Sequence, residues 1–159
     1  MEFFTLGVYN STEKDFFSRL IKNKIDTFCD VRQRRGVRGA KYSFVNSKKL
    51  QLELAELNIK YCHILDLAPT EGIRKLQKEI DIQKDELKTQ RKELGNNFIN
   101  EYRNLILKNF DFKDFLEKLN RSNANRIVFF CVEEYPKACH RSIVADELTN
   151  HYKLKVTNL

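Results

Sequence analysis

The chain has 159 residues, with 29 Lys and Arg against 22 Asp and Glu, so its formal net charge at pH 7 is +7. This length suits a single domain that buries roughly 70% of the surface its unfolded chain would expose. Its apolar runs are far shorter than a bilayer span, and no basic-then-apolar leader follows Met1. We therefore expect a soluble cytoplasmic protein without a membrane partner, whose positive charge favours polyanions.

The cysteines are Cys29, Cys62, Cys131 and Cys139. They are widely separated, and they show neither the paired spacing of a zinc site nor the density of a disulfide framework. We expect reduced thiols, and the sequence predicts no metal site. Walker and dinucleotide-binding glycine patterns are also missing, so no cofactor is expected.

Two apolar segments near the start of the chain have the composition of strands. Residues 3–6 predict a first strand and residues 25–31 predict a second, with a helix capped near Thr12 between them. The second strand delivers Asp30 and Arg32 to one face, because these residues are two positions apart.

A loop dense in cations follows the second strand. Its arginines are Arg32, Arg34, Arg35 and Arg38, and the aromatic residues Tyr42 and Phe44 come after them. Arginines can contact phosphates, and Tyr42 can stack on a base. The alternative is a solvated basic loop whose aromatic side chains pack into the core, which we favour for Phe44.

A helix and a third strand come next. Residues 46–58 predict the helix, and residues 59–65 predict the strand, with His63 near its end. A histidine in this place can take part in catalysis or can serve only as a hydrogen-bonded structural group.

The segment 71–95 has a different pattern. Apolar residues recur there every seven positions, at Ile73, Ile80, Leu87 and Leu94. This spacing predicts one long heptad-like helix inserted within the domain. Such a helix can pack along the domain or can pair with a second copy as a homodimer.

The last third of the chain predicts helices over residues 98–110 and 112–119, and then a strand over residues 127–132. That strand is a continuous apolar run, typical of a strand buried on both faces of a parallel sheet. A helix over residues 141–152 follows it, and residues 153–157 predict an edge strand.

The loop between the buried strand and the helix after it concentrates reactive side chains. Cys139, His140 and Arg141 fall at the helix start, where N–H groups and the helix dipole favour anions. A thiol there should ionise more easily than a free cysteine, and Arg141 can clamp a carboxylate or phosphate. Glu133 shares the strand face of Cys131 and can act as a base or hold an arginine. In the alternative reading, the cysteine is a small buried hydrophobe and the arginine pairs with a glutamate.

Strands separated by helices predict an α/β fold. We expect a three-layer domain over residues 1–159, with a mostly parallel sheet of about five strands and helices on both faces. The strand ends that carry Arg32, His63 and Glu133 would then converge near Cys139.

Two groups of motifs carry a family resemblance. The more specific group is Cys131-x-Glu133 followed by Pro136-x-x-Cys139-His140-Arg141. The supporting positions are Thr5-Leu6-Gly7, Asp30-Val31-Arg32, Phe44 with Asn46, and Tyr61-x-His63. Together they resemble the family called domain of unknown function 488 (DUF488), over nearly the whole chain except the heptad helix. The resemblance implies a three-layer α/β domain and brings no established reaction.

The leading hypothesis is a domain that binds a phosphate-bearing ligand, a nucleotide or nucleic acid, at the strand ends. The expected ligand-binding residues are Asp30, Arg32, Arg34, Arg35, Arg38, Tyr42 and Arg141. One alternative is a thiol-dependent hydrolase or transferase with Cys139 as the nucleophile. In that case His140, His63 or Glu133 would handle protons. Another is a protein-interaction module that works through helix 71–95.

Overall fold

The branched and aromatic runs of the sequence form the strands of one parallel sheet. The computed structural model describes residues 1–159 and orders the strands β3-β2-β4-β1-β5. The strands are β1 (Glu2–Leu6), β2 (Thr27–Asp30), β3 (Lys60–His63), β4 (Arg126–Phe130) and β5 (Val156–Asn158). Every neighbouring pair is parallel, so the carboxyl ends of all the strands lie at one edge of the sheet.

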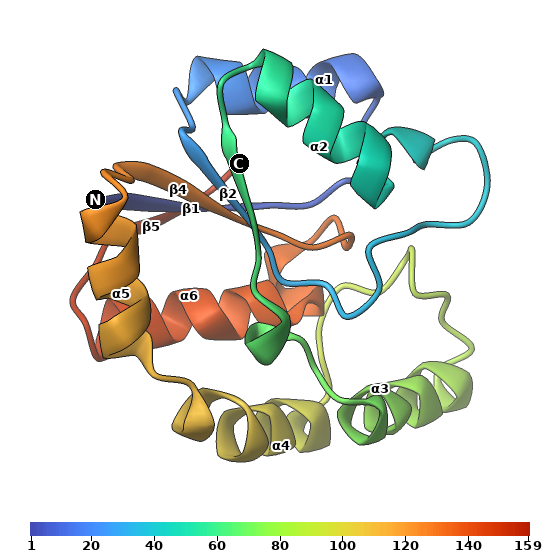
Figure 1. Ribbon diagram of the computed structural model, residues 1–159. Helices are drawn as coiled ribbons and strands as arrows, with labels where there is room; N and C mark the ends of the chain where they lie inside the picture. The colour runs from blue at the N-terminus through green and yellow to red at the C-terminus, as the bar shows by residue number, and fades with distance from the viewer.

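Helices cover both faces of this sheet, which confirms the predicted three-layer α/β fold (Figure 1). Their bounds are α1 (Glu13–Lys22), α2 (Ser47–Glu56), α3 (Glu71–Gln83), α4 (Asn96–Leu105), α5 (Phe112–Arg121) and α6 (His140–Asn150). Helices α1 and α2 lie on one face, and α5 and α6 lie on the other. Helix α3 packs on α4, which in turn contacts α6. None of these helices has both the length and the apolar character that crossing a bilayer requires.

The helices start in two different ways. Thr12, Thr70 and Asp111 each accept a hydrogen bond from an N–H of the first turn that follows them, a cap worth about 1 kcal/mol. Helix α6 follows Cys139, whose side chain makes no such bond. The first N–H groups of α6 therefore keep their capacity to stabilise negative charge.

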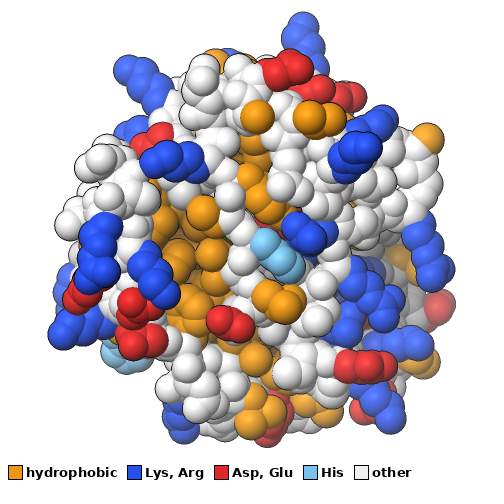
Figure 2. Space-filling model, viewed as in Figure 1, with side chains coloured by type: hydrophobic (Ala, Val, Ile, Leu, Met, Phe, Trp, Pro, Cys, Tyr) orange, Lys and Arg blue, Asp and Glu red, His pale blue; other side chains and the backbone are white.

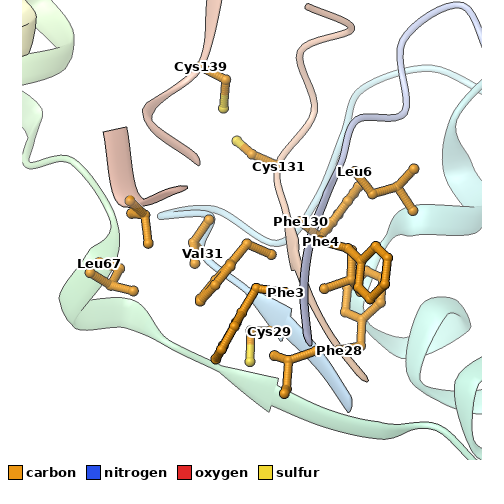
Figure 3. Packing of buried hydrophobic residues seen from close by; sticks show 14 of the residues in the cluster. Phe3, Phe4, Leu6, Phe28, Cys29, Val31, Leu67, Phe130, Cys131 and Cys139 are labelled. Carbon is orange, nitrogen blue, oxygen red and sulfur yellow. The ribbon is translucent and has the colours of Figure 1, made fainter. Parts of the chain in front are cut away.

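The sheet separates two apolar layers. On one face, Phe16 of α1 packs against Phe28 and Phe130, with ring centroids 6.3 and 5.4 Å away. On the other face, Phe129 packs against Phe115 of α5. Figure 3 shows Phe28 and Phe130 within this core. Burial on both faces explains why β4 is a continuous apolar run in the sequence.

The helix predicted over residues 71–95 is shorter than expected. Helix α3 ends at Gln83, and Asp85 has a left-handed backbone conformation with a φ of 48°. Continuing the helix would bury little apolar surface, since Leu87 is 65% exposed. The predicted heptad stripe therefore does not form, and residues 84–95 run as an irregular segment between α3 and α4.

Two other predicted boundaries also shift. The helix predicted over residues 98–110 ends at Leu105, because the chain turns there and buries Leu107. The edge strand predicted over residues 153–157 begins later, as β5, since Lys153 has a left-handed φ of 56°.

The end of β1 approaches the loop after β4 very closely. A Cβ atom on Gly7 would overlap the Glu133 carbonyl oxygen and would lie 3.1 Å from Nη2 of Arg141. The Tyr9 N–H donates to the Val132 carbonyl at 3.0 Å. The loop that carries Glu133 is thereby fixed against the end of β1.

Gly7→Ala should destabilise the protein, because the added methyl group must push β1 away from the Glu133 carbonyl. Overpacking of this kind costs about 1–3 kcal/mol, occasionally more. Urea unfolding monitored by circular dichroism should give a lower midpoint. Gly36→Ala is the matched control, since the nearest atom to its Cβ would be Asn46 Oδ1 at 3.8 Å. An unchanged midpoint for Gly7→Ala would contradict the close approach.

Candidate functional site

A cavity of about 660 Å³ opens at the carboxyl edge of the sheet, between the ends of β2 and β4. Its volume lies in the range of small-molecule sites, and the carboxyl edge is where open α/β sheets bind ligands. One wall comes from the segment after β2, and another comes from α3 and residues 84–95. The third comes from the segment between β4 and α6.

The charged side chains of the lining are mostly cationic. The cations are Arg32, Arg34, Arg38, Arg74, Lys78, Lys88 and Arg91, and the carboxylates are Asp81 and Glu133. Figure 2 shows Lys and Arg side chains spread over the visible face, including its right side next to α3 and the neighbouring loops. The excess of positive charge favours an anionic ligand.

Arg32 is 3% exposed and lies at the end of β2. Its Nε and Nη2 donate to the carboxylate of Asp30, at 2.8 and 2.7 Å. Its guanidinium also lies 4.6 Å from the centroid of the Phe130 ring. The remaining nitrogen, Nη1, is buried and has no hydrogen-bond partner. A buried donor without a partner costs about 1–3 kcal/mol, so a ligand oxygen that reached this atom would be stabilised by it.

A second buried donor on the cavity wall is also unpaired. Arg74, on α3, has no hydrogen-bond partner for its Nε. The cavity also has apolar lining, including Phe98 and the pair Tyr9 and Tyr42, whose ring centroids are 5.3 Å apart. The site thus offers cationic donors together with aromatic surface.

Cys139 and His140 form a directed pair at the start of α6. Both side chains are buried, and Sγ of Cys139 lies 3.7 Å from Nδ1 of His140. Nε2 of His140 lies 2.9 Å from the carbonyl oxygen of Val31. A carbonyl oxygen only accepts, so Nε2 carries a proton, and the lone pair of neutral Nδ1 faces the thiol.

Charge favours transfer of the Cys139 proton to His140. Burial and the charge of Glu133 would raise the pKa of the Cys139 thiol, but hydrogen bonding from Cys131 and the charges of His140 and Arg141 lower it below its ordinary value. Burial alone would lower the pKa of His140, but the Cys139 thiolate raises it. The pair is therefore set up as a thiolate and an imidazolium.

Cys131 and Glu133 lie beside this pair, on the same face of the chain leaving β4. The thiol of Cys131 donates to Oε2 of Glu133 at 3.2 Å. The same thiol also lies within 4.8 Å of the Cys139 sulfur. The Cys139 thiolate and burial raise the pKa of Cys131, so Cys131 stays a thiol.

The Glu133 carboxylate is buried and holds residues 84–95 in place. Its Oε1 accepts from Nη2 of Arg91 at 3.1 Å and lies 3.3 Å from Nζ of Lys88. Arg91 also donates to the Ala138 carbonyl and to Asp81. Burial would raise the pKa of the Glu133 carboxyl, but Lys88 and Arg91 hold it well below its usual range.

One cluster has the spacing of metal ligands. Cys131, Cys139 and His140 each offer a ligand atom, and these atoms lie within 4.8 Å of one another. The nearest carboxylate, Glu133, is already paired with cations. The cationic lining also works against a divalent ion, so we assign no metal here.

The structure brings most of the predicted site residues to the cavity. The predicted residues in its lining are Arg32, Arg34, Arg38, Tyr42, Glu133, Cys139 and His140. The predicted residues outside the lining are Asp30, Arg35, His63 and Arg141. Asp30 orients Arg32, and His63 Nε2 lies 2.9 Å from the Arg32 carbonyl oxygen.

Arg141 does not act as the predicted anion clamp at this cavity. It is 1% exposed, and its Nη1 and Nη2 donate to the carbonyls of Glu133 and Glu134 at 2.7 and 2.9 Å. These bonds hold the loop after β4 in place. The physical reason is that the loop carbonyls already occupy both Nη atoms of the guanidinium.

Sequence reasoning missed the cavity residues of the segment 71–95. Arg74, Lys88 and Arg91 belong to a stretch whose many charges predict a solvated helix face. No spacing rule distinguishes Arg91 from its neighbours, because its role depends on the turn after α3 and on contacts with Glu133.

The comparisons with known proteins give one match. The sequence model of a family described as "Domain of unknown function DUF488" matches residues 12–148. No curated protein and no solved structure matches the chain.

The low pKa of Glu133 predicts acid-sensitive stability. A carboxyl whose pKa is lower in the folded state stabilises the fold above its unfolded pKa of about 4.3, and this contribution is lost as pH falls below that value. Glu133→Gln should therefore lower the free energy of unfolding by about 3–5 kcal/mol at pH 7, since it leaves buried cations unpaired. This gap in unfolding free energy between the variant and the parent protein should narrow in acid. Urea unfolding between pH 3.5 and 7 measures the gap.

The control for this prediction is Glu134→Gln. Glu134 is the next carboxylate in the chain, and its side chain accepts a hydrogen bond from the Asn10 side-chain amide. This variant should keep the acid sensitivity of the parent protein. A constant gap between Glu133→Gln and the parent at all pH values would contradict the ion-pair assignment.

Proposed function

The chain belongs to the DUF488 family, which carries no assigned reaction, and we propose that its cavity binds a phosphate-bearing small molecule of nucleotide size. The observation that carries this proposal is the unpaired Nη1 of Arg32, a residue that lines the cavity. A phosphate oxygen would satisfy that donor and would be further stabilised by the cationic wall.

The shape of the site favours a small ligand over a nucleic-acid strand. The cavity is concave, and it places the aromatic residues Tyr9, Tyr42 and Phe98 on the same lining as the arginines. A nucleotide presents both matching parts, an anionic phosphate and a planar base. A nucleic-acid strand would instead follow the exposed arginines of the loop after β2, such as Arg34 and Arg38.

A second function, thiol-dependent transfer or hydrolysis, is favoured by the Cys139 and His140 pair. Cys139 supplies a nucleophilic thiolate, and His140 holds a proton at Nδ1 that it can give to a leaving group. The Val31 carbonyl orients the imidazole through Nε2. Both functions use one cavity, because Cys139, His140 and Arg32 all line it.

The binding proposal is tested by a thermal-shift titration with nucleoside mono-, di- and triphosphates, pyrophosphate, phosphate and single-stranded DNA. A nucleotide should raise the melting temperature by mass action. Arg32→Lys keeps a cation beside Asp30 but removes Nη1, and Arg74→Gln removes the second unpaired donor. Each should weaken binding by about 10- to 100-fold, the value of one charge-assisted hydrogen bond.

Arg121→Gln is the control, since Arg121 is an exposed arginine on α5 that does not line the cavity. It lowers the net charge as Arg74→Gln does, and it should leave nucleotide affinity unchanged. The binding proposal would be wrong if Arg32→Lys, Arg74→Gln and Arg121→Gln all bound the nucleotide with equal affinity. If only single-stranded DNA stabilised the protein, and did so with a steep salt dependence, the ligand would be a nucleic acid rather than a nucleotide.

The thiol function predicts an unusual alkylation profile for Cys139. Iodoacetamide labelling, read by peptide mass spectrometry from pH 5 to 10, should show Cys139 reacting well below the pH at which a free cysteine ionises. His140→Asn should move the midpoint up towards about 8.5, the value of a free cysteine. Cys62 is the internal control, because burial raises the pKa of its thiol. A Cys139 midpoint that is ordinary in the parent protein would exclude the thiolate.

A further inference from the structure

Cys131 helps to lower the pKa of Cys139, but it forms no bond in the proposed binding or thiol chemistry, and it lines the same cavity as Cys139. Its ligand atom and that of Cys139 belong to a cluster whose members all lie within 4.8 Å of one another. In Figure 3 the two sulfur atoms point towards each other, one from the end of β4 and one from the start of α6. The chain thus places two thiols in different protonation states side by side.

We infer that Cys139 and Cys131 form a dithiol site that reduces hydroperoxides, with Cys139 as the attacking thiol and Cys131 as the resolving thiol. The inference rests on the Cys139 thiolate of the proposed thiol function and adds a co-substrate class to it. The cavity gives a small peroxide a route to both sulfurs, although the cysteines are only 1% and 5% exposed.

The first step oxidises Cys139. Its thiolate attacks one peroxide oxygen, so an S–O bond forms and the O–O bond breaks. The departing hydroxide takes the proton from Nδ1 of His140 and leaves as water. Sulfur loses two electrons to the peroxide and becomes a sulfenic acid.

The second step closes a disulfide. The sulfur of Cys131 attacks the sulfur of Cys139, so an S–S bond forms and the S–O bond breaks. The departing hydroxide takes the thiol proton that Cys131 otherwise shares with Glu133, and it leaves as a second water. In sum, two thiols and one hydrogen peroxide give one disulfide and two waters.

The second step requires a modest movement of the two cysteine side chains. A disulfide needs its sulfurs about 2.05 Å apart, so the side chains must rotate towards each other. Cys139 has an extended backbone in front of α6, and no helix-cap hydrogen bond of its side chain has to break for it to rotate. Arg141 meanwhile holds the intervening loop through the carbonyls of Glu133 and Glu134.

The chain contains a matched pair of thiols without these features. Cys29 and Cys62 lie opposite each other on the neighbouring strands β2 and β3. Neither of them lines the cavity, and neither forms a hydrogen bond with a histidine. If proximity were sufficient, peroxide would oxidise both pairs of thiols. The inferred mechanism predicts that only Cys131 and Cys139 are oxidised.

The test treats the reduced full chain with one equivalent of hydrogen peroxide. The parent protein should lose about 2 Da, the mass of two hydrogens, and non-reducing peptide mapping should join Cys131 to Cys139. In Cys131→Ser the reaction should stop at a sulfenic acid that is about 16 Da heavier and is trapped by dimedone. Cys139→Ser should react at least about tenfold more slowly, and Cys29→Ser should behave as the parent does.

Three results would overturn the inference: a parent protein without the Cys131–Cys139 bond, equal oxidation of the Cys29 and Cys62 pair, or stoichiometric zinc released from the purified protein when Cys131 and Cys139 are modified. The alkylation profile separates the possible failures. A reactive Cys139 thiolate that forms no disulfide defeats only the dithiol inference, whereas an unreactive Cys139 defeats the thiol function as well.

Discussion

The buried Glu133 carboxylate is the charge on which the carboxyl edge of the sheet depends. A carboxylate in this position is tolerated only when cations and donors surround it, and Arg91, Lys88 and Cys131 supply them. Through Arg91 the same group draws residues 84–95 against the loop after β4, which creates one wall of the cavity. A single buried charge thus connects the shape of the cavity to the protonation state of the nearby thiols.

The site has two tasks that use positive charge. Its cationic lining attracts an anion into the cavity, and the helix dipole of α6 together with His140 and Arg141 stabilises a thiolate at Cys139. These tasks compete, because an anion bound close to the thiolate would raise the energy of the negative sulfur. A ligand that places its phosphate near Arg32 and Arg74, away from Cys139, would avoid that competition.

The sequence allowed the architecture to be predicted more fully than the site. Continuous apolar runs such as that of β4, alternating with helices, suffice for a parallel three-layer fold, and the structure confirms it. The strand-end motifs also led to Cys139 and Glu133, because parallel strands collect their ends at one edge. The route of residues 84–95 and the use of Arg141 escaped prediction, since both depend on tertiary contacts with the loop carbonyls and on the end of α3 at Gln83.

The hydrogen bond between His140 Nε2 and the Val31 carbonyl spans 109 positions of the chain. Cys139 and His140 are neighbours in any conformation, but this contact exists only once β2 and β4 have paired. Contacts of such long range close late in folding, after local helices and turns have formed. On an emerging or partly folded chain, Cys139 is therefore an ordinary thiol, and its reactivity arises only with the completed sheet.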